Sequence, residues 1–294
     1  MEEYKLLEKE FAKFVGKEHA VAVNTGTAGL HVTLAALGIK QGDEVIVPDF
    51  TMAACGFAVS YTGAKVVTVD CGDDLNINVN LIEEKITANT KAIMGVHIYG
   101  RLCDMKKIRE IADRYGLYVI EDASEAHGAT NGEYADAVVF SLYKNKIIHA
   151  EEGGIICTDD KQLAKKINYL KCMAFGEEHD YYHKEIGFNY RMPETQAILA
   201  RKSLANYTHN NELRRKAEKD LYGKNELDAV WVLPHLCSTQ EERDLIVKND
   251  PNTRYFFKPL STMPMWKQEV GKNALKYSKL GYYQNFDTKR YRIL

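Results

Sequence analysis

Short β-branched runs alternate with longer amphipathic segments over the first 175 residues of the chain. Residues 27–37, 52–61, 80–87, 104–115 and 160–173 carry apolar side chains three or four positions apart, which predicts helices. Continuous apolar strands separated by helices are typical of a parallel sheet that is buried on both faces. The sequence therefore predicts an α/β domain with a mostly parallel sheet of seven strands. The predicted strands are HAVAVN, EVIVPD, KVVTVD, KAIMGVHIYG, LYVIED, DAVVFSLY and GGIICTD.

The pattern changes after residue 175, where a polar, aromatic loop precedes a helical run from about residue 193 to 221. The rest of the chain is less regular. It contains a predicted strand (VWVLPHL), a short predicted helix (STQEERDLIVKN) and the segment YFFKPLSTMPMW. We expect a large domain over residues 1–205 and a small, shortened α+β domain over residues 206–294. No linker or low-complexity tract separates them, so the two domains should pack closely.

Composition excludes several classes of partner. The 294 residues include 39 Lys and Arg against 41 Asp and Glu, so no overall charge attracts nucleic acid or an anionic membrane. No stretch approaches the roughly 20 apolar residues of a spanning helix, and the start, MEEYKLLEKEF, is charged. The six cysteines are scattered without a C-x-x-C pair, which predicts neither a zinc site nor a disulfide framework. We expect a protein of the reducing cytoplasm without nucleic-acid, membrane or metal partners.

The loop in NTGTAGLHVTLAAL leads from a predicted strand into a predicted helix through small residues. Gly26 and Thr27 would bring backbone N–H groups and a hydroxyl to the positive end of that helix, which suits a phosphate group. A tight turn with an N-capping threonine would explain the same pattern. The loop has neither the G-K-[ST] of a Walker loop nor a G-x-G-x-x-G fingerprint. Both interpretations stay open on this segment alone.

The segment LYVIEDASEAHGA ends a strand with an acidic pair. Asp122 could hold a cationic nitrogen, ligate a metal or cap the next helix, and capping is the commonest of these roles. No acidic or histidine cluster with metal-ligand spacing lies nearby in the sequence. Glu125 and His127 belong to the same loop, where a single histidine is as often structural as catalytic.

Two lysines, Lys144 and Lys146, follow Ser141 between two apolar strands. A lysine in apolar surroundings loses its proton more readily, which Schiff-base chemistry requires. Most lysines, however, are solvated surface charges. Spacing does not choose between the two, nor does it show that either is catalytic.

Taken in order, these segments resemble the DegT/StrS family of nucleotide-sugar aminotransferases, which are fold type I pyridoxal phosphate enzymes. The resemblance covers about residues 8–205, with further similarity in GDEVIVPDFT, TKAIMGVHIYG and FFKPLSTMPM. Each motif is weak by itself, whereas their ordered combination is specific. The motifs are the small-residue loop, E-D-A-x-x-A-H-G, F-S-x-x-x-x-K-x-x-x-x-x-E-G-G and G-x-N-x-R-M.

The resemblance implies roles for particular residues. Lys146 matches the lysine that binds the cofactor as a Schiff base, whereas Lys144 falls on a variable position. Asp122 matches the aspartate that pairs with the pyridine nitrogen and keeps the ring protonated, so that the cofactor accepts electrons. Glu125 stands near the cofactor ring, where many members carry Gln and some carry Glu.

Other matching positions concern the phosphate group. Gly26, Thr27 and Ser141 match residues that hold it. Asn189 matches an asparagine that reaches the phosphate from the neighbouring subunit, which implies a homodimer with shared active sites. In a departure from the family, Met52 stands where many members carry an aromatic residue over the cofactor ring, and a thioether can still pack there.

The resemblance implies that pyridoxal 5'-phosphate carries an amino group from L-glutamate to a nucleotide-linked keto sugar. The segment FFKPLSTMPM is similar to that of perosamine and viosamine synthases, which favours a 4-keto-6-deoxyhexose as acceptor. The candidates for binding the carboxylates and the diphosphate are Arg191, Lys258, Arg254 and Lys184. A solvated surface charge is an equal alternative for each of them.

Two alternatives share the same fold. One is a dehydratase, but the family members that dehydrate sugars carry His in place of the Schiff-base lysine, and Lys146 argues against that branch. The other is a cofactor-binding regulator without turnover. Relatives usually extend well beyond 294 residues. The shortening falls after residue 220 and at the C-terminus, where relatives build the domain that encloses the sugar.

Overall fold

A computed structural model describes residues 2–176 and 181–286, so part of the polar loop after residue 175 lies outside the described residues. Its centre is a seven-stranded sheet with the strand order β1-β7-β6-β5-β4-β2-β3. Only β7 runs opposite to the other six strands. The expected mostly parallel α/β sheet is confirmed. The strands are β1 (His19–Val23), β2 (Glu44–Pro48), β3 (Lys65–Val69), β4 (Thr90–Val96), β5 (Tyr118–Asp122), β6 (Ala137–Ser141) and β7 (Gly154–Thr158).

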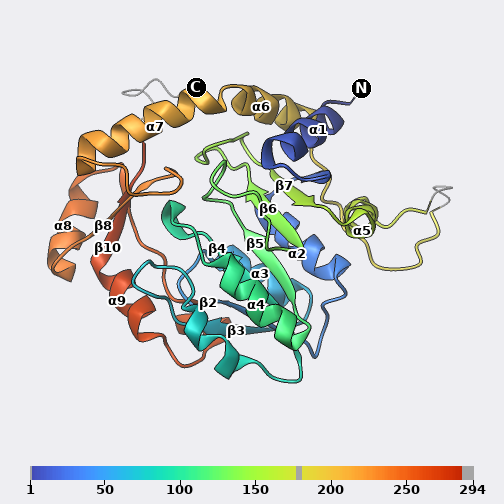
Figure 1. Cartoon of the computed structure of the whole chain (residues 1–294), viewed down its shortest axis with the longest axis horizontal. Helices are drawn as coiled ribbons and strands as arrows, with labels where there is room; N and C mark the ends of the chain where they lie inside the picture. Colours follow the sequence, from blue (N-terminus) through green and yellow to red (C-terminus); the bar gives the residue numbers. More distant parts are fainter. Residues whose placement is uncertain (1, 177–180, 287–294) are drawn as a thin grey trace.

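Helices cover both faces of this sheet (Figure 1). In α4, Ile108 and Ile111 are buried against the sheet, the Asp104 side chain accepts a hydrogen bond from the N–H of Lys107, and Gly116 ends the helix at φ 64°. The large-domain helices are α1 (Glu3–Val15), α2 (Gly26–Ala36), α3 (Ala53–Tyr61), α4 (Met105–Tyr115), α5 (Lys161–Lys171) and α6 (Glu194–Ala205).

One local prediction was wrong in this domain, and one helix was not predicted. Residues 80–87 form two short 3₁₀ turns, η1 (Val79–Leu81) and η2 (Glu83–Lys85), instead of one helix. Ile82 is the only side chain between residues 80 and 87 that is fully buried, so an amphipathic helix would have nothing more to pack. Sequence reasoning also missed α1, although Leu7 and Phe11 are completely buried, each contributing about 1.5–3 kcal/mol.

Alternate residues of the strands face two separate apolar cores. In β5, Ile120 belongs to the larger core, on the side of α2 and α3, whereas Val119 belongs to the core beneath α4. Side chains alternate along a strand, so residues two positions apart face the same side of the sheet. Asp122 therefore faces the same side as Ile120, and Glu121 faces the same side as Val119. The acidic pair is therefore split between the two faces of the sheet.

The C-terminal part begins with the helical run predicted over residues 193–221, which breaks at Asn206. A three-stranded antiparallel sheet with the order β8-β10-β9 follows. In Figure 1 this part, orange to red, lies to the left of the large sheet. The structure does not test a domain boundary after residue 205, which stays a prediction. The elements are α7 (Tyr207–Tyr222), β8 (Leu233–Leu236), α8 (Gln240–Asn249), β9 (Thr253–Tyr255), η4 (Leu260–Thr262), η5 (Pro264–Trp266), α9 (Lys272–Leu280) and β10 (Gly281–Gln284).

Two aspartates at the ends of large-domain strands anchor this C-terminal part. Asp49, after β2, accepts hydrogen bonds from the N–H and the hydroxyl of Ser261, both at 2.8 Å. Asp70, after β3, accepts from the N–H groups of Asn273 and Ala274 at 3.0 and 2.9 Å. A Cβ atom on Gly271 would lie 2.3 Å from a carboxylate oxygen of Asp70, so this close approach requires glycine. The tail is thus fixed at the edge of the sheet where β2 and β3 end.

Among the described residues, no helix is both long enough and apolar enough to cross a lipid bilayer.

Candidate active site

A cavity of about 380 Å³ lies between the large sheet and the C-terminal part. The strand ends and the loops after them supply much of its wall, which is where α/β sheets bind ligands. The residues that the resemblance assigns to the cofactor line this cavity, with the exception of Asn189. They are Gly26, Thr27, Met52, Asp122, Glu125, Ser141 and Lys146.

The first turn of α2 forms one side of the cavity. Thr25 is its N-cap, and the Oγ1 atom accepts a hydrogen bond from the N–H of Ala28 at 3.0 Å. Thr25, and not Thr27, is therefore the residue that caps α2. Thr27 lines the cavity, where its hydroxyl is not needed for capping. Gly26 lies directly against β6, since a Cβ atom there would be 2.9 Å from the Cβ of Ser141. Backbone N–H groups of a helix start and two hydroxyls thus gather at one place, an arrangement that suits a phosphate group.

Asp122, at the end of β5, is held in place by two hydrogen bonds. Its Oδ1 accepts from the N–H of Ser124 at 3.0 Å, which stabilises a local turn, since no helix follows β5 directly for Asp122 to cap. Its Oδ2 accepts from the thiol of Cys55 at 3.3 Å. Burial and the neighbouring carboxylate raise the pKa of Cys55 well above its usual value, so the thiol keeps its proton and donates. The carboxylate is therefore fixed in orientation and lines the cavity.

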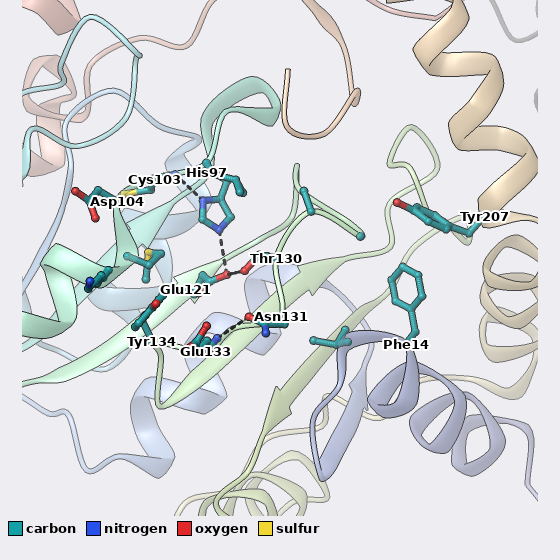
Figure 2. Close-up of a pocket in the computed structure, with 16 residues that line it drawn as sticks. Phe14, His97, Cys103, Asp104, Glu121, Thr130, Asn131, Glu133, Tyr134 and Tyr207 are labelled. Carbon is teal, nitrogen blue, oxygen red and sulfur yellow. Dashed lines mark hydrogen bonds and ion pairs between the residues drawn. The ribbon is translucent and has the colours of Figure 1, made fainter. Parts of the chain in front are cut away.

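Glu121 points to the other face of the sheet, into a second pocket of about 630 Å³ (Figure 2). Its Oε1 lies 3.0 Å from Nε2 of His97 and accepts from the hydroxyl of Thr130 at 2.6 Å. Nδ1 of His97 accepts from the N–H of Cys103, so the proton of the imidazole is on Nε2 and points to Glu121. Glu121 is thus part of a satisfied structural network. No cluster of metal-ligating side chains occurs in residues 2–176 and 181–286.

His127, in the same loop, is a neutral core residue. Burial lowers its pKa to about 3, and its ring packs against Phe140 with centroids 5.3 Å apart. It does not line the cavity. Of the two readings that the sequence allowed for this histidine, the structural one fits.

The loop between β6 and β7 carries Lys146 into the cavity. Lys146 is only 9% exposed, whereas Lys144 is exposed on the same loop. Its Nζ atom lies 3.8 Å from Oε1 of Glu125 and 3.6 Å from the centroid of the Trp231 ring. Burial lowers the pKa of this amine, against the opposing charge of Glu125. A buried amine of this kind gives up its proton readily and can act as a nucleophile.

Glu125 is the partner of that amine. Burial raises its pKa to about 7, although the charge of Lys146 opposes the rise. Its other oxygen, Oε2, accepts a hydrogen bond from the N–H of Tyr99 at 2.7 Å. Tyr99 adopts φ 51°, an unfavourable conformation for a bulky residue, and is completely buried. The strained backbone aims this N–H at Glu125 and so fixes the carboxylate beside Lys146.

Sequence reasoning missed the residues that the C-terminal part contributes. Trp231, Phe257 and Tyr283 line the cavity together with Tyr143 and Asn145. The segments VWVLPHL and FFKPLSTMPM were noticed, but as a strand and as an indication of substrate. Nothing in a single sequence shows which of their side chains reach a lysine more than 80 positions earlier.

The remaining expected residues lie as follows. Met52 is the N-cap of α3 and lines the cavity while 54% exposed. Asn189 is exposed outside the cavity, and its Oδ1 accepts from Nε of Arg191 at 3.2 Å. The four candidate cations do not line the cavity either. They are Arg191, Lys258, Arg254 and Lys184.

The cavity fits pyridoxal phosphate. The start of α2 with Thr27 and Ser141 suits the phosphate, the oriented carboxylate of Asp122 suits the protonated ring nitrogen, and Lys146 suits the aldehyde carbon. Fold and site together define a fold type I pyridoxal phosphate enzyme. Comparison with known proteins gives the particular group: the chain belongs to the DegT/DnrJ/EryC1/StrS aminotransferase family, whose model matches residues 2–284.

Individual relatives agree with this family. A GDP-perosamine synthase of Escherichia coli O157:H7 is 37% identical over 292 residues, which cover 91% of this chain and 80% of that enzyme. A GDP-perosamine synthase of Caulobacter vibrioides is 46% identical over 198 residues, which cover 65% of this chain and 53% of that enzyme. The matched region thus spans about half the length of one curated relative and four fifths of the other.

Solved structures confirm the expected fold type. The Streptomyces venezuelae protein DesV, solved with a ketimine intermediate, superimposes with a TM-score of 0.87 and 31% identity over 97% of this chain and 84% of that chain. NtdA of Bacillus subtilis, solved with its cofactor PMP, gives a TM-score of 0.87 and 29% identity over 96% of this chain and 72% of that chain.

Proposed function

We propose that this protein uses pyridoxal 5'-phosphate to move an amino group from L-glutamate to a nucleotide-linked keto sugar, with a 4-keto-6-deoxyhexose as acceptor. The observation that carries the proposal is the meeting of buried Lys146 with fixed Asp122 in one cavity. Family membership supports the reaction class. We also propose that the protein works in the cytoplasm, where its six free cysteines stay reduced.

The chain's own residues have distinct tasks in this proposal. When bound, pyridoxal phosphate supplies an electron sink for the carbon from which a proton is removed. Asp122 holds a proton on the ring nitrogen by its negative charge. Lys146 would anchor the cofactor, give it up to an incoming amine, and carry at Nζ the proton of the 1,3-shift between the two carbons that flank the transferred nitrogen. Glu125, whose pKa is raised by burial, lies with Oε1 3.8 Å from that amine and influences its charge.

The proposed acceptor follows the names of relatives. Two are GDP-perosamine synthases, and a Streptomyces venezuelae relative, 40% identical over 205 residues, is a dTDP-3-amino-3,4,6-trideoxy-α-D-glucose transaminase. Aromatic and apolar side chains of the C-terminal part, Phe257 and Tyr283, line the cavity and suit the apolar face of a deoxysugar.

A two-step experiment tests the proposed reaction. We expect L-glutamate alone to convert bound pyridoxal phosphate to the pyridoxamine form and release one equivalent of its 2-oxo acid. A nucleotide-linked 4-keto-6-deoxyhexose should then restore the starting spectrum. With isotopically labelled glutamate, mass spectrometry should find the labelled nitrogen in the sugar.

Other results would favour the alternatives. A sugar that loses water without gaining nitrogen would indicate a dehydratase. A chain that binds the cofactor but gives no spectral change with any donor would indicate a regulator without turnover. Either result would contradict the proposal.

We further propose a homodimer in which Asn189 completes the neighbouring subunit's site. Its position outside its own chain's cavity supports this, as do the exposed apolar side chains of Met52 and Ile186, which are 54% and 84% exposed. Two individually inactive variants, Lys146→Ala and Asn189→Ala, should then recover roughly a quarter of the wild-type activity when they are mixed and allowed to exchange subunits. Mixed activity no higher than the average of the two variants would contradict shared sites.

A further inference from the structure

Trp231, in the segment between α7 and β8, forms the wall of the cavity beside Lys146. The amine nitrogen lies 3.6 Å from the centroid of its ring. The indole Nε1 donates a hydrogen bond at 2.9 Å to the carbonyl oxygen of Asn145, the residue directly before the lysine. Trp231 is 4% exposed. The hydrogen bond to Asn145 therefore holds the indole ring at a fixed position relative to the backbone that carries Lys146.

Other aromatic rings hold the indole in this orientation. Tyr99 stacks with it at 6.2 Å between centroids and 18° between planes, and Tyr283 lies at 5.9 Å. Nη1 of Arg214 donates to the carbonyl oxygen of Trp231 at 2.9 Å. The indole cannot turn away from Lys146 without displacing these neighbours, so its position is set by both parts of the molecule.

The groups that face the amine are few. Oε1 of Glu125 is 3.8 Å away, which is beyond hydrogen-bond distance, and the charge of Asp122 has a smaller effect on the amine than that of Glu125. Cys55 keeps its proton and His127 is neutral. The face of an indole attracts an ammonium ion, and more strongly where water is excluded. Trp231 therefore stabilises the charged form of Lys146, against the effect of burial.

We propose that Trp231 is a positioning residue that receives the Lys146 ammonium on its ring whenever this amine is not bonded to the cofactor. The inference rests on the proposed role of Lys146. The amine is then kept within the cavity, from which it can return to the same carbon. In this arrangement the C-terminal part of the chain supplies a component of the catalytic centre as well as a wall for the substrate.

The chain offers a matched control, because Trp266 is its only other tryptophan. Trp266 is also buried, comes from the C-terminal part, and donates from its indole nitrogen to Oγ of Ser60 at 2.8 Å. It does not line the cavity. Trp231→Leu and Trp266→Leu therefore remove equal volume and one indole hydrogen bond each, but only the first removes the ring face beside Lys146.

The experiment follows bond formation between Lys146 and pyridoxal phosphate. The full chain, freed of cofactor, is mixed with pyridoxal phosphate at a series of pH values. The rate of bond formation with loss of water is recorded by absorbance and assigned to Lys146 by borohydride reduction and peptide mapping. Only the uncharged amine attacks the aldehyde. In Trp231→Leu the charged amine loses its stabilisation, so the pH midpoint of the rate should fall by about one unit. In Trp266→Leu it should stay at the wild-type value.

The outcomes separate this inference from the proposed function. If the wild type forms no bond at Lys146, the proposed function fails, and this inference fails with it. If the wild type forms the bond but the Trp231→Leu profile is unchanged, or Trp266→Leu shifts it equally, only the role of Trp231 is wrong. Should Trp231→Leu not fold, Trp231→Phe replaces it: a benzene ring attracts cations more weakly, so the midpoint should fall by about half a unit, with no change in Trp266→Phe.

Discussion

Replacing Lys146 by alanine should abolish amino transfer, with a fall in kcat of roughly 10⁴-fold or more, because one substitution removes both a nucleophile and a proton carrier. The visible absorption of the lysine-bound cofactor should also disappear. Pyridoxal phosphate should still bind, but more weakly, because the phosphate contacts at the start of α2 remain. Absorbance and equilibrium dialysis measure these two effects separately.

Lys144→Ala is the matched control for this variant. Lys144 lies two positions away on the same loop and is exposed, so its removal should leave the spectrum and kcat close to those of the wild type. The spacing of the sequence did not choose between these lysines, so the pair of variants tests the assignment directly. Loss of the spectrum in Lys144→Ala with retention in Lys146→Ala would reverse it.

Replacing Asp122 by asparagine should lower kcat by about 10²–10³-fold, because the amide keeps the shape of the side chain but not the charge that holds a proton on the ring nitrogen. Bound cofactor should still form its bond to Lys146. We expect the slow step to be removal of the α-proton of L-glutamate. A single turnover with glutamate deuterated at its α-carbon measures this step. The kinetic isotope effect should be larger than in the wild type, because proton removal becomes rate-limiting.

Glu121→Gln provides the comparison, since Glu121 is the other half of the acidic pair and faces the opposite pocket with His97 and Thr130 (Figure 2). This variant should lose thermal stability, because a buried hydrogen-bonded charge is removed, but keep the isotope effect of the wild type. An Asp122→Asn enzyme with wild-type kcat would show that another group holds the ring proton.

The predicted sheet succeeded because its signal is local. Apolar runs such as EVIVPD and LYVIED carry enough β-branched residues to identify strands, and small or polar residues end them. The segment at residues 80–87 shows the limit of periodicity. Apolar residues three or four apart occur there, yet burial of Ile82 alone selects short turns over a helix.

The site was predictable to the extent that its residues follow strands. Asp122 and Ser141 end β5 and β6, and the start of α2 follows β1, so the topology of a parallel sheet brings them to one edge. The ordered motifs then assigned Lys146. Trp231 and Tyr99 lay beyond this reasoning, because their positions depend on how the C-terminal part docks and on a strained backbone at residue 99.

The anchoring of the tail also bears on the order of events during synthesis. Asp49 precedes its partner Ser261 by 212 residues, which a ribosome adds in roughly 10–40 s at about 5–20 residues per second. The strands of the large sheet are complete once Thr158 has been added, but the carboxylate of Asp49 lacks its hydrogen-bond donors until Ser261 follows. We expect a nascent chain to capture cofactor poorly until the segment that carries Ser261 has emerged, so that loading with cofactor follows docking of this segment.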